Sequence, residues 1–278
     1  MRKLFKRQMA IATAAVLVVA LGLGISSLFL HAHAASSWVG PKQYDLGLGD
    51  SLAFGFQPDL NFDDGYVQDF YSNLKQHGVT SLTNYGCNGE TSTTMINGGC
   101  PFQIALHNYY LGPQLNVALK FLHNHAGQVS PVTLDMGAND LLPDINRSTC
   151  AVAASWSNDL ATLNANLVNT ILPQLAAALT NSQGQRTGDL IVMNYYDPFI
   201  NNCPNSVPYV QQMNTTIANA AAKFGAHLVD VYSAFGGANQ GANICNYTWI
   251  CNFLFHDVHA TDSGYQVIAN AFAATSGY

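Results

Sequence analysis

The sequence predicts one α/β domain with a parallel sheet that is covered by helices on both faces. Short apolar runs alternate with segments of helical periodicity along most of the chain, and this alternation is typical of parallel sheets. Residues 35–278 are sufficient for one domain of this class. No internal repeat and no low-complexity linker divides them.

Five apolar runs bounded by turn residues predict the strands. In chain order they are Tyr44–Leu48, Val79–Tyr85, Val132–Met136, Leu190–Asn194 and His227–Val231. Apolar residues at helical spacing predict helices over Gly65–Gln76, Ala151–Thr180, Val207–Phe224 and Asp262–Ala274. Pro131 and Gly137 bound the third strand, and Pro173 is expected to kink or split the second of these helices.

The first 34 residues predict an export signal that precedes the domain. A basic cluster is followed by an apolar run from Met9 to Leu30 and by the small-x-small sequence Ala32-His33-Ala34. This order indicates a signal peptide cleaved after Ala34 and a secreted domain over residues 35–278. The apolar run is also long enough to span a bilayer, so a membrane-anchored extracytoplasmic protein is the alternative. No membrane span is expected in the mature chain.

The charge of the mature chain excludes some classes of partner. Four of the ten Lys and Arg residues lie in the leader, which leaves six against 16 Asp and Glu, a net charge of −10. Such a surface disfavours binding to nucleic acid or to anionic lipid, because few cations are available to neutralise phosphates. A monomer without a nucleic-acid partner is expected.

The exported part contains six cysteines, an even number that favours three disulfides in an oxidising compartment. Pairing in sequence order gives Cys87–Cys100, Cys150–Cys203 and Cys245–Cys251, and this is the expected connectivity. Six cysteines allow about 15 pairings, and free buried thiols are the alternative.

Polar motifs follow the predicted strands at the edge where sites form in open α/β sheets. Gly49-Asp50-Ser51-Leu52 follows the first strand and offers Ser51 as a nucleophile. Gly86 to Gly89 follows the second strand, where glycines let backbone N–H groups approach a ligand. Gly137-Ala138-Asn139-Asp140 follows the third strand and offers the Asn139 amide as a donor. Helix caps and ordinary turns explain each motif equally well when it is taken alone.

His256-Asp257-Val258-His259 precedes the last helix, and histidine is the usual proton carrier near neutral pH. Together the four motifs supply a nucleophile, a backbone donor, a side-chain donor and a base, the groups that acyl transfer requires. A metal site is the alternative, because His256 and His259 are three residues apart and His123 and His125 are two apart. No third ligand is evident, and neither a metal nor a cofactor is expected.

The ordered set of Gly-Asp-Ser-Leu, the glycine turn, Gly-x-Asn-Asp and a late histidine resembles the SGNH (GDSL) hydrolase family. The resemblance implies a flavodoxin-like three-layer sandwich with a five-stranded parallel sheet. It implies Ser51 as the nucleophile and His259 as the base. It also implies an oxyanion hole made by the Ser51 N–H, the Gly89 N–H and the Asn139 amide.

One position departs from the family pattern. Most members have an aspartate three residues before the base, but His256 stands there and Asp257 is only two residues before His259. The secreted, disulfide-containing branch of the family includes members with a Ser-His dyad, and the run Trp249-Ile250-Cys251 is similar to that branch. A dyad is therefore expected, with the His256 carbonyl orienting His259 and with Asp257 falling short of the imidazole.

These expectations make the protein a secreted serine hydrolase that cleaves small-molecule or lipid esters. A carbohydrate O-acetyl esterase or an acyltransferase of the same fold is the first alternative. A non-catalytic surface-binding domain is the second. Five aromatic residues are candidates for an acyl pocket, for sugar stacking or for the core: Phe54, Phe56, Tyr109, Tyr110 and Trp249.

Overall fold

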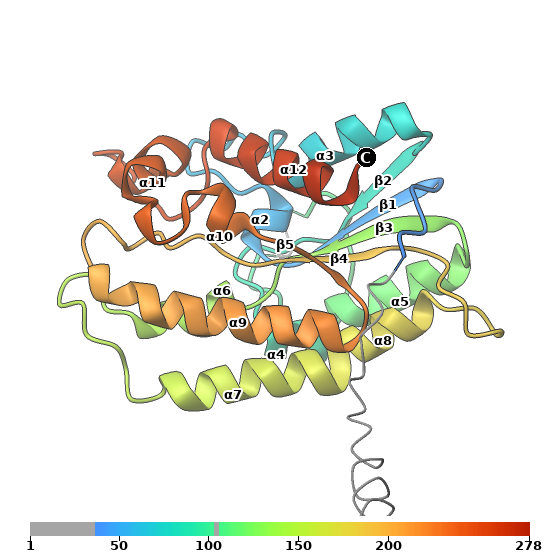
Figure 1. Cartoon of the computed structure of the whole chain (residues 1–278), viewed down its shortest axis with the longest axis horizontal. Helices are drawn as coiled ribbons and strands as arrows, with labels where there is room; N and C mark the ends of the chain where they lie inside the picture. The colour runs from blue at the N-terminus through green and yellow to red at the C-terminus, as the bar shows by residue number, and fades with distance from the viewer. Residues whose placement is uncertain (1–36, 103–105) are drawn as a thin grey trace, which may run out of the picture. The chain divides into compact units, whose positions relative to one another are not determined.

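A five-stranded parallel sheet forms the centre of the fold (Figure 1). The computed structural model describes residues 37–102 and 106–278, so the predicted signal peptide lies outside the described residues. The strands are β1 (Tyr44–Leu48), β2 (Ser81–Asn84), β3 (Val129–Leu134), β4 (Leu190–Met193) and β5 (His227–Val229), in the spatial order β2-β1-β3-β4-β5. Every neighbouring pair is parallel, which confirms the predicted α/β class and the flavodoxin-like sheet.

Helices cover both faces of the sheet. On one face lie α3 (Tyr66–Leu74), α10 (Val231–Ala234), α11 (Gly241–Tyr247) and α12 (Asp262–Ser276). On the other lie α4 (Ser92–Asn97), α5 (Gln114–Asn124), α7 (Trp156–Asn166), α8 (Leu172–Ala178) and α9 (Val207–Lys223). Two short helices, α2 (Ser51–Phe54) and α6 (Ala138–Leu141), directly follow β1 and β3.

The core between the sheet and the first of these helical layers is closely packed. Tyr66 of α3 stacks on Phe272 of α12 with ring centroids 5.0 Å apart, and both side chains are fully buried. Gly47 of β1 lies against Val67, where a Cβ atom would come within 2.7 Å of a Val67 methyl group. The glycine therefore allows α3 to pack close to the strand.

The third strand differs from its prediction at the start. It begins at Val129, so Pro131 lies inside the strand rather than before it. The register with β1 shifts between Tyr44 and Leu46, and the shift forms a bulge opposite Ser130 and Pro131. A bulge accommodates a proline in a central strand because the missing N–H is not required by the ladder.

The predicted helix over residues 151–180 is also divided differently. It starts at Trp156, and a π-helical turn at Leu167–Ile171 separates α7 from α8. Pro173 occupies the first turn of α8, directly after this π-helical turn. The break therefore lies before the proline.

Three disulfides connect the loops, Cys87–Cys100, Cys150–Cys203 and Cys245–Cys251, and they are the pairs expected from the sequence. Among the described residues, no helix is both long and apolar enough to cross a membrane.

Both ends of the described chain meet beside the amino ends of β4 and β5. The backbone N–H groups of Val39 and Gly40 donate to the Asp189 carboxylate at 2.8 and 2.9 Å. The Tyr278 hydroxyl donates to the same carboxylate. Trp38 stacks on His227 with ring centroids 3.4 Å apart. This edge is opposite to the carboxyl ends of the strands.

Candidate active site

Ser51 lies at the carboxyl end of β1, where the strand turns sharply into α2. Gly49 has φ +136°, and a Cβ atom there would overlap the Asp135 side chain, so only glycine fits. The Asp50 carboxylate caps α2 by accepting from the Leu52 N–H at 2.9 Å. The turn brings Ser51 to the start of the helix, with only a small part of its surface exposed.

Ser51 and His259 are in direct contact, although 208 residues separate them. His259 Nε2 lies 2.7 Å from Ser51 Oγ. On the other side of the ring, His259 Nδ1 lies 2.5 Å from Asp257 Oδ1. Because a carboxylate only accepts, the proton lies on Nδ1, and Nε2 is the acceptor that faces the serine hydroxyl.

The expectation that Asp257 falls short of the imidazole is wrong. Its carboxylate, not the carbonyl of His256, contacts Nδ1 in the described structure. The same Oδ1 accepts from the His259 backbone N–H at 2.8 Å, so the side chain folds back over two residues. His256 is exposed, adopts φ +47°, and its Nδ1 lies 3.4 Å from the Ile250 carbonyl oxygen.

The charge distribution in this cluster favours an ionised Asp257. Burial raises the pKa of its carboxyl, but the hydrogen bonds and the charge of His259 outweigh burial, so the pKa lies below the usual 3.8. An anion at this position stabilises the imidazolium that forms when Nε2 takes up a proton.

The loop that carries His259 is fixed from several sides. The His259 carbonyl accepts from the Trp249 N–H at 3.0 Å, and the Asp257 N–H donates to the Trp249 carbonyl at 3.2 Å. The Cys245–Cys251 disulfide closes the preceding segment, which contains Trp249. Phe56 packs against the imidazole with ring centroids 4.6 Å apart. The ring is therefore positioned independently of a bound substrate.

Gly89 occupies a tight turn beside Ser51. The Glu90 N–H donates to the Cys87 carbonyl at 3.0 Å, and Gly89 has φ +83°, as the third position of a type II turn requires. In the described structure the backbone N–H groups of Gly89 and Ser51 donate to no protein acceptor. Both are therefore free to bind a ligand oxygen.

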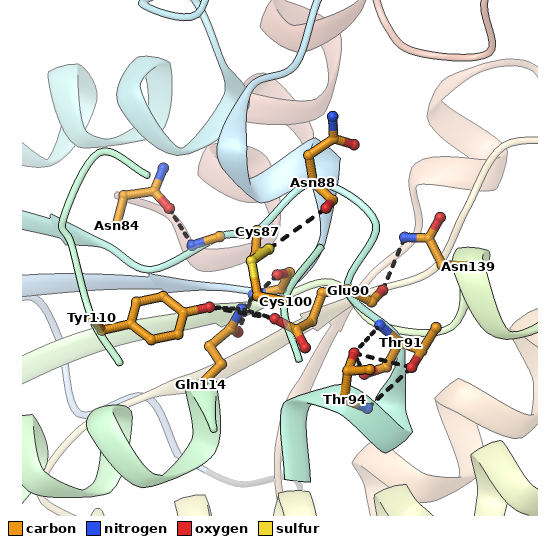
Figure 2. The surroundings of a disulfide bond; sticks show 12 residues. Asn84, Cys87, Asn88, Glu90, Thr91, Thr94, Cys100, Tyr110, Gln114 and Asn139 are labelled. Atoms are coloured by element: carbon orange, nitrogen blue, oxygen red, sulfur yellow. Dashed lines mark hydrogen bonds between the residues drawn. A yellow bond between two sulfur atoms is a disulfide. The ribbon is translucent and has the colours of Figure 1, made fainter. Parts of the chain in front are cut away.

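Asn139 lies beside the same turn. It belongs to α6, which follows the carboxyl end of β3. Its Nδ2 donates to the Glu90 carbonyl at 2.9 Å, which leaves the second proton of the amide available (Figure 2). The next residue, Asp140, accepts from the Ser92 N–H at 2.9 Å and from the Ser92 hydroxyl at 2.5 Å. These bonds join α4, which follows the Gly89 turn, to α6, which contains Asn139.

Glu90, which the sequence analysis did not single out, supports this turn through its buried side chain. Its side chain is fully buried, and its Oε2 accepts from the Gln114 amide at 3.3 Å and from the Tyr110 hydroxyl at 3.4 Å (Figure 2). Burial raises the pKa of this carboxyl to about 7. The Glu90 carboxyl therefore titrates near neutral pH, and it lies directly after Gly89 in the chain.

A pair of buried acidic residues, Asp50 and Asp135, lies behind Ser51. Asp135 accepts from the Asp50 N–H at 3.1 Å and from the Ala53 N–H at 2.9 Å, and Asp50 accepts from the Tyr195 hydroxyl at 2.9 Å. Burial raises the pKa of both carboxyls, and the charge of Asp50 raises that of Asp135 further. The two carboxylates accept hydrogen bonds from backbone N–H groups on both sides of Ser51, and these bonds hold the turn in place.

A cavity of about 320 Å³ opens in front of Ser51 and His259. Its walls are mainly apolar, with Leu142, Ile145, Phe199 and Val258 among the lining residues, and Arg147 also lines it. None of the five aromatic residues named from the sequence lines this cavity. Phe54 and Tyr110 are buried, Tyr109 is 68% exposed, Phe56 packs on His259, and the Trp249 indole donates to Gln57. Tyr195, Tyr196 and Phe199 are the aromatic residues of the cavity.

One cluster of potential metal ligands occurs among the described residues, formed by Cys87, Glu90 and Cys100. The two cysteines form a disulfide and so offer no thiolate to a metal ion. His259 contacts Ser51 and Asp257, and His125 Nδ1 lies 3.0 Å from the Phe121 carbonyl oxygen. The cluster therefore does not supply a ligand set for zinc.

Solved structures with the same fold include several ester hydrolases. The acetylxylan esterase Axe2 of Geobacillus stearothermophilus matches with a TM-score of 0.58 and 16% identity over 87% of this chain and 97% of its own. A putative GDSL-like lipase of Parabacteroides merdae matches at 0.56 and 16%, over 87% and 99%. Phospholipase A1 of Streptomyces albidoflavus matches at 0.52 and 15%, over 84% and 99%. At these identities the matches show the shared fold.

A search of curated protein sequences found no match. The profile of the GDSL-like lipase/acylhydrolase family, in contrast, matches residues 48–267, which contain all four sequence motifs and most of the domain. The chain therefore belongs to the GDSL-like lipase/acylhydrolase family and is an enzyme that hydrolyses ester bonds.

Proposed function

We propose that the protein is a secreted serine esterase or lipase that acts through an acyl-enzyme on Ser51. The observation that carries the proposal is the chain of contacts from Ser51 Oγ to His259 Nε2 at 2.7 Å and from His259 Nδ1 to Asp257 Oδ1 at 2.5 Å. A serine hydroxyl with a base in hydrogen-bond contact, and a third group that orients the base, is the arrangement of an activated nucleophile.

In the first step His259 Nε2 takes the Ser51 proton while Oγ attacks the ester carbonyl. The resulting imidazolium is stabilised by Asp257, and it then donates its proton to the leaving alcohol. The alcohol departs, and the acyl group remains on Oγ. His259 next activates a water molecule, which hydrolyses the acyl-enzyme and restores Ser51.

The negative charge of each tetrahedral intermediate would be bound by three donors. These are the N–H groups of Ser51 and Gly89, which have no acceptor within the described structure, and the second amide proton of Asn139. Donors that are already positioned stabilise the oxyanion without reorganising during the reaction.

The disulfide content of the domain supports export from the cytoplasm. Three disulfides are consistent with an oxidising compartment. We infer that residues 1–34 are a signal peptide and that residues 35–278 form the catalytic domain.

The test is hydrolysis of p-nitrophenyl esters from acetyl to palmitoyl by the mature protein and by Ser51→Ala, with fluorophosphonate labelling of both. Turnover and labelling that depend on Ser51 support the proposal. A preference for acetyl would favour a carbohydrate O-acetyl esterase, and rising activity with chain length would favour a lipase. A folded, disulfide-bonded protein with neither turnover nor labelling would contradict the mechanism and favour a binding domain.

A further inference from the structure

Arg147 lines the cavity in front of Ser51 and His259, and it is the only Lys or Arg among the lining residues. Only six Lys and Arg residues follow the predicted leader, against 16 Asp and Glu. A positive charge at this cavity is therefore unusual for this chain, whose surface otherwise repels anions.

The guanidinium forms no salt bridge with a carboxylate of the described residues. Both salt bridges among the described residues involve histidine, and neither includes Arg147. Its carbon Cζ lies 5.2 Å from the ring centroid of Phe199, another residue of the cavity wall. An aromatic ring of this kind orients an arginine by a cation–π contact while leaving its five N–H donors available.

The loop that carries Arg147 is well supported. Asn146 Oδ1 accepts from the N–H groups of Ser148 and Thr149, each at 2.9 Å. The Cys150–Cys203 disulfide connects the loop to the segment beyond β4, and the Cys203 sulfur lies 3.6 Å from the Arg147 carbonyl oxygen. The backbone of Arg147 is thus held at the cavity by covalent and hydrogen bonds.

From this geometry we propose that Arg147 binds a carboxylate or phosphate of the substrate, so that the enzyme prefers esters with a negative charge near the scissile bond. The proposal rests on the proposed serine esterase function and specifies its substrate class. Guanidinium groups bind carboxylates and phosphates through two parallel hydrogen bonds, and Arg147 is exposed at the cavity, where a substrate anion can reach it.

A competing role for Arg147 is electrostatic support of the catalytic residues. Its charge is one of the influences that lower the pKa of Asp257, although it is smaller than that of His259. Loss of such support would slow the hydrolysis of every ester equally and would move the acid limb of the pH profile. Loss of an anion-binding group would instead raise KM for charged esters alone.

The experiment compares matched substrates that differ in charge. One pair is monoethyl adipate and diethyl adipate, which tests a carboxylate. The other pair is 1-hexanoylglycerol 3-phosphate and 1-hexanoylglycerol, which tests the phosphate of a lipid headgroup. Each is assayed by pH-stat with the mature protein, Arg147→Gln, Arg147→Lys and Lys120→Gln, the last being a charge-matched control at an exposed position of α5.

We expect Arg147→Gln to lower kcat/KM for the charged member of at least one pair by about tenfold to a hundredfold, mainly through KM. Its activity on the neutral esters should stay within about twofold of the parent. Arg147→Lys should retain part of the preference, and Lys120→Gln all of it. The pair that responds identifies the anion.

Two results would overturn the proposal: an equal loss on charged and neutral esters, or an unchanged preference in both pairs. Failure of the mature protein to hydrolyse even the neutral esters would be a different result. It would refute the esterase function itself, and with it the substrate class that rests on it.

Discussion

Asp257 orients His259 across a separation of only two residues. The carboxylate oxygen Oδ1 accepts from both the backbone N–H and the ring Nδ1 of His259, at 2.8 and 2.5 Å. The single intervening residue, Val258, has its carbonyl bound by the Tyr196 hydroxyl at 2.8 Å. An aspartate that folds back on the chain in this way fixes the base from the same loop that carries it.

Replacing Asp257 by Asn is therefore expected to lower kcat by up to about 10⁴-fold, because the amide can stabilise the wrong tautomer of His259 and cannot neutralise the imidazolium. The measurement is the steady-state hydrolysis of p-nitrophenyl butyrate. Asp63→Asn, at an exposed position, is the matched control and should leave kcat unchanged. A variant with nearly normal turnover would restore the dyad that the sequence suggested.

Asn139→Ala is expected to lower kcat by about 10²–10³-fold, since one donor to the oxyanion is removed. KM should change little, because the contact strengthens in the transition state. The variant also loses the bond to the Glu90 carbonyl, so thermal unfolding must be measured beside the kinetics. Asn116→Ala on the exposed side of α5 provides the control. Normal turnover in Asn139→Ala would remove this amide from the mechanism.

Glu90 predicts a specific dependence of stability on pH. Its pKa is about 7 in the folded protein, against an ordinary value of 4.5. Between these values the folded protein retains a proton that the unfolded chain has lost, so this group makes the protein less stable as the pH rises. The full effect on the free energy of unfolding is about 3 kcal/mol, because a tenfold difference in proton affinity corresponds to about 1.4 kcal/mol.

Glu90→Gln should remove this dependence. The measurement is urea unfolding of both proteins at pH 5 and pH 8. Relative to the parent, the variant should have a higher free energy of unfolding at pH 8 than at pH 5. The buried Asp45 does not act on Glu90 and is present in both proteins, so its contribution cancels in the comparison. A difference that is the same at both pH values would show that the Glu90 carboxyl is not perturbed.

Much of the fold was predictable because the signals are local. β1 lies at Tyr44–Leu48 as expected, and the other strands agree within a few residues, since each is a short apolar run that ends in turn residues. The helix α5 was missed although Leu115, Ala118 and Leu122 have helical spacing and are buried. The bulge at Pro131 was not predictable, because it depends on register with β1 rather than on the strand itself.

The active site was predictable only in part. Ser51, Gly89 and Asn139 each belong to a short motif that follows a strand, and the sheet topology brings these strand ends together, whereas His259 belongs to a motif that precedes α12. The reach of Asp257 depends on the backbone path between it and His259, which spacing alone does not give. The raised pKa of Glu90 results from its burial, and the proposed role of Arg147 results from its position at the cavity. Both depend on contacts between distant parts of the chain, which no local sequence pattern encodes.

The meeting of Val39, Gly40 and Tyr278 on Asp189 has a practical consequence. The described chain begins and ends beside the amino ends of the strands, whereas Ser51 lies at their carboxyl ends. A solid support, a display scaffold or a fluorescent partner joined at either end would leave the cavity facing outward. Immobilised enzyme coupled through its termini should therefore keep the turnover number of the free protein.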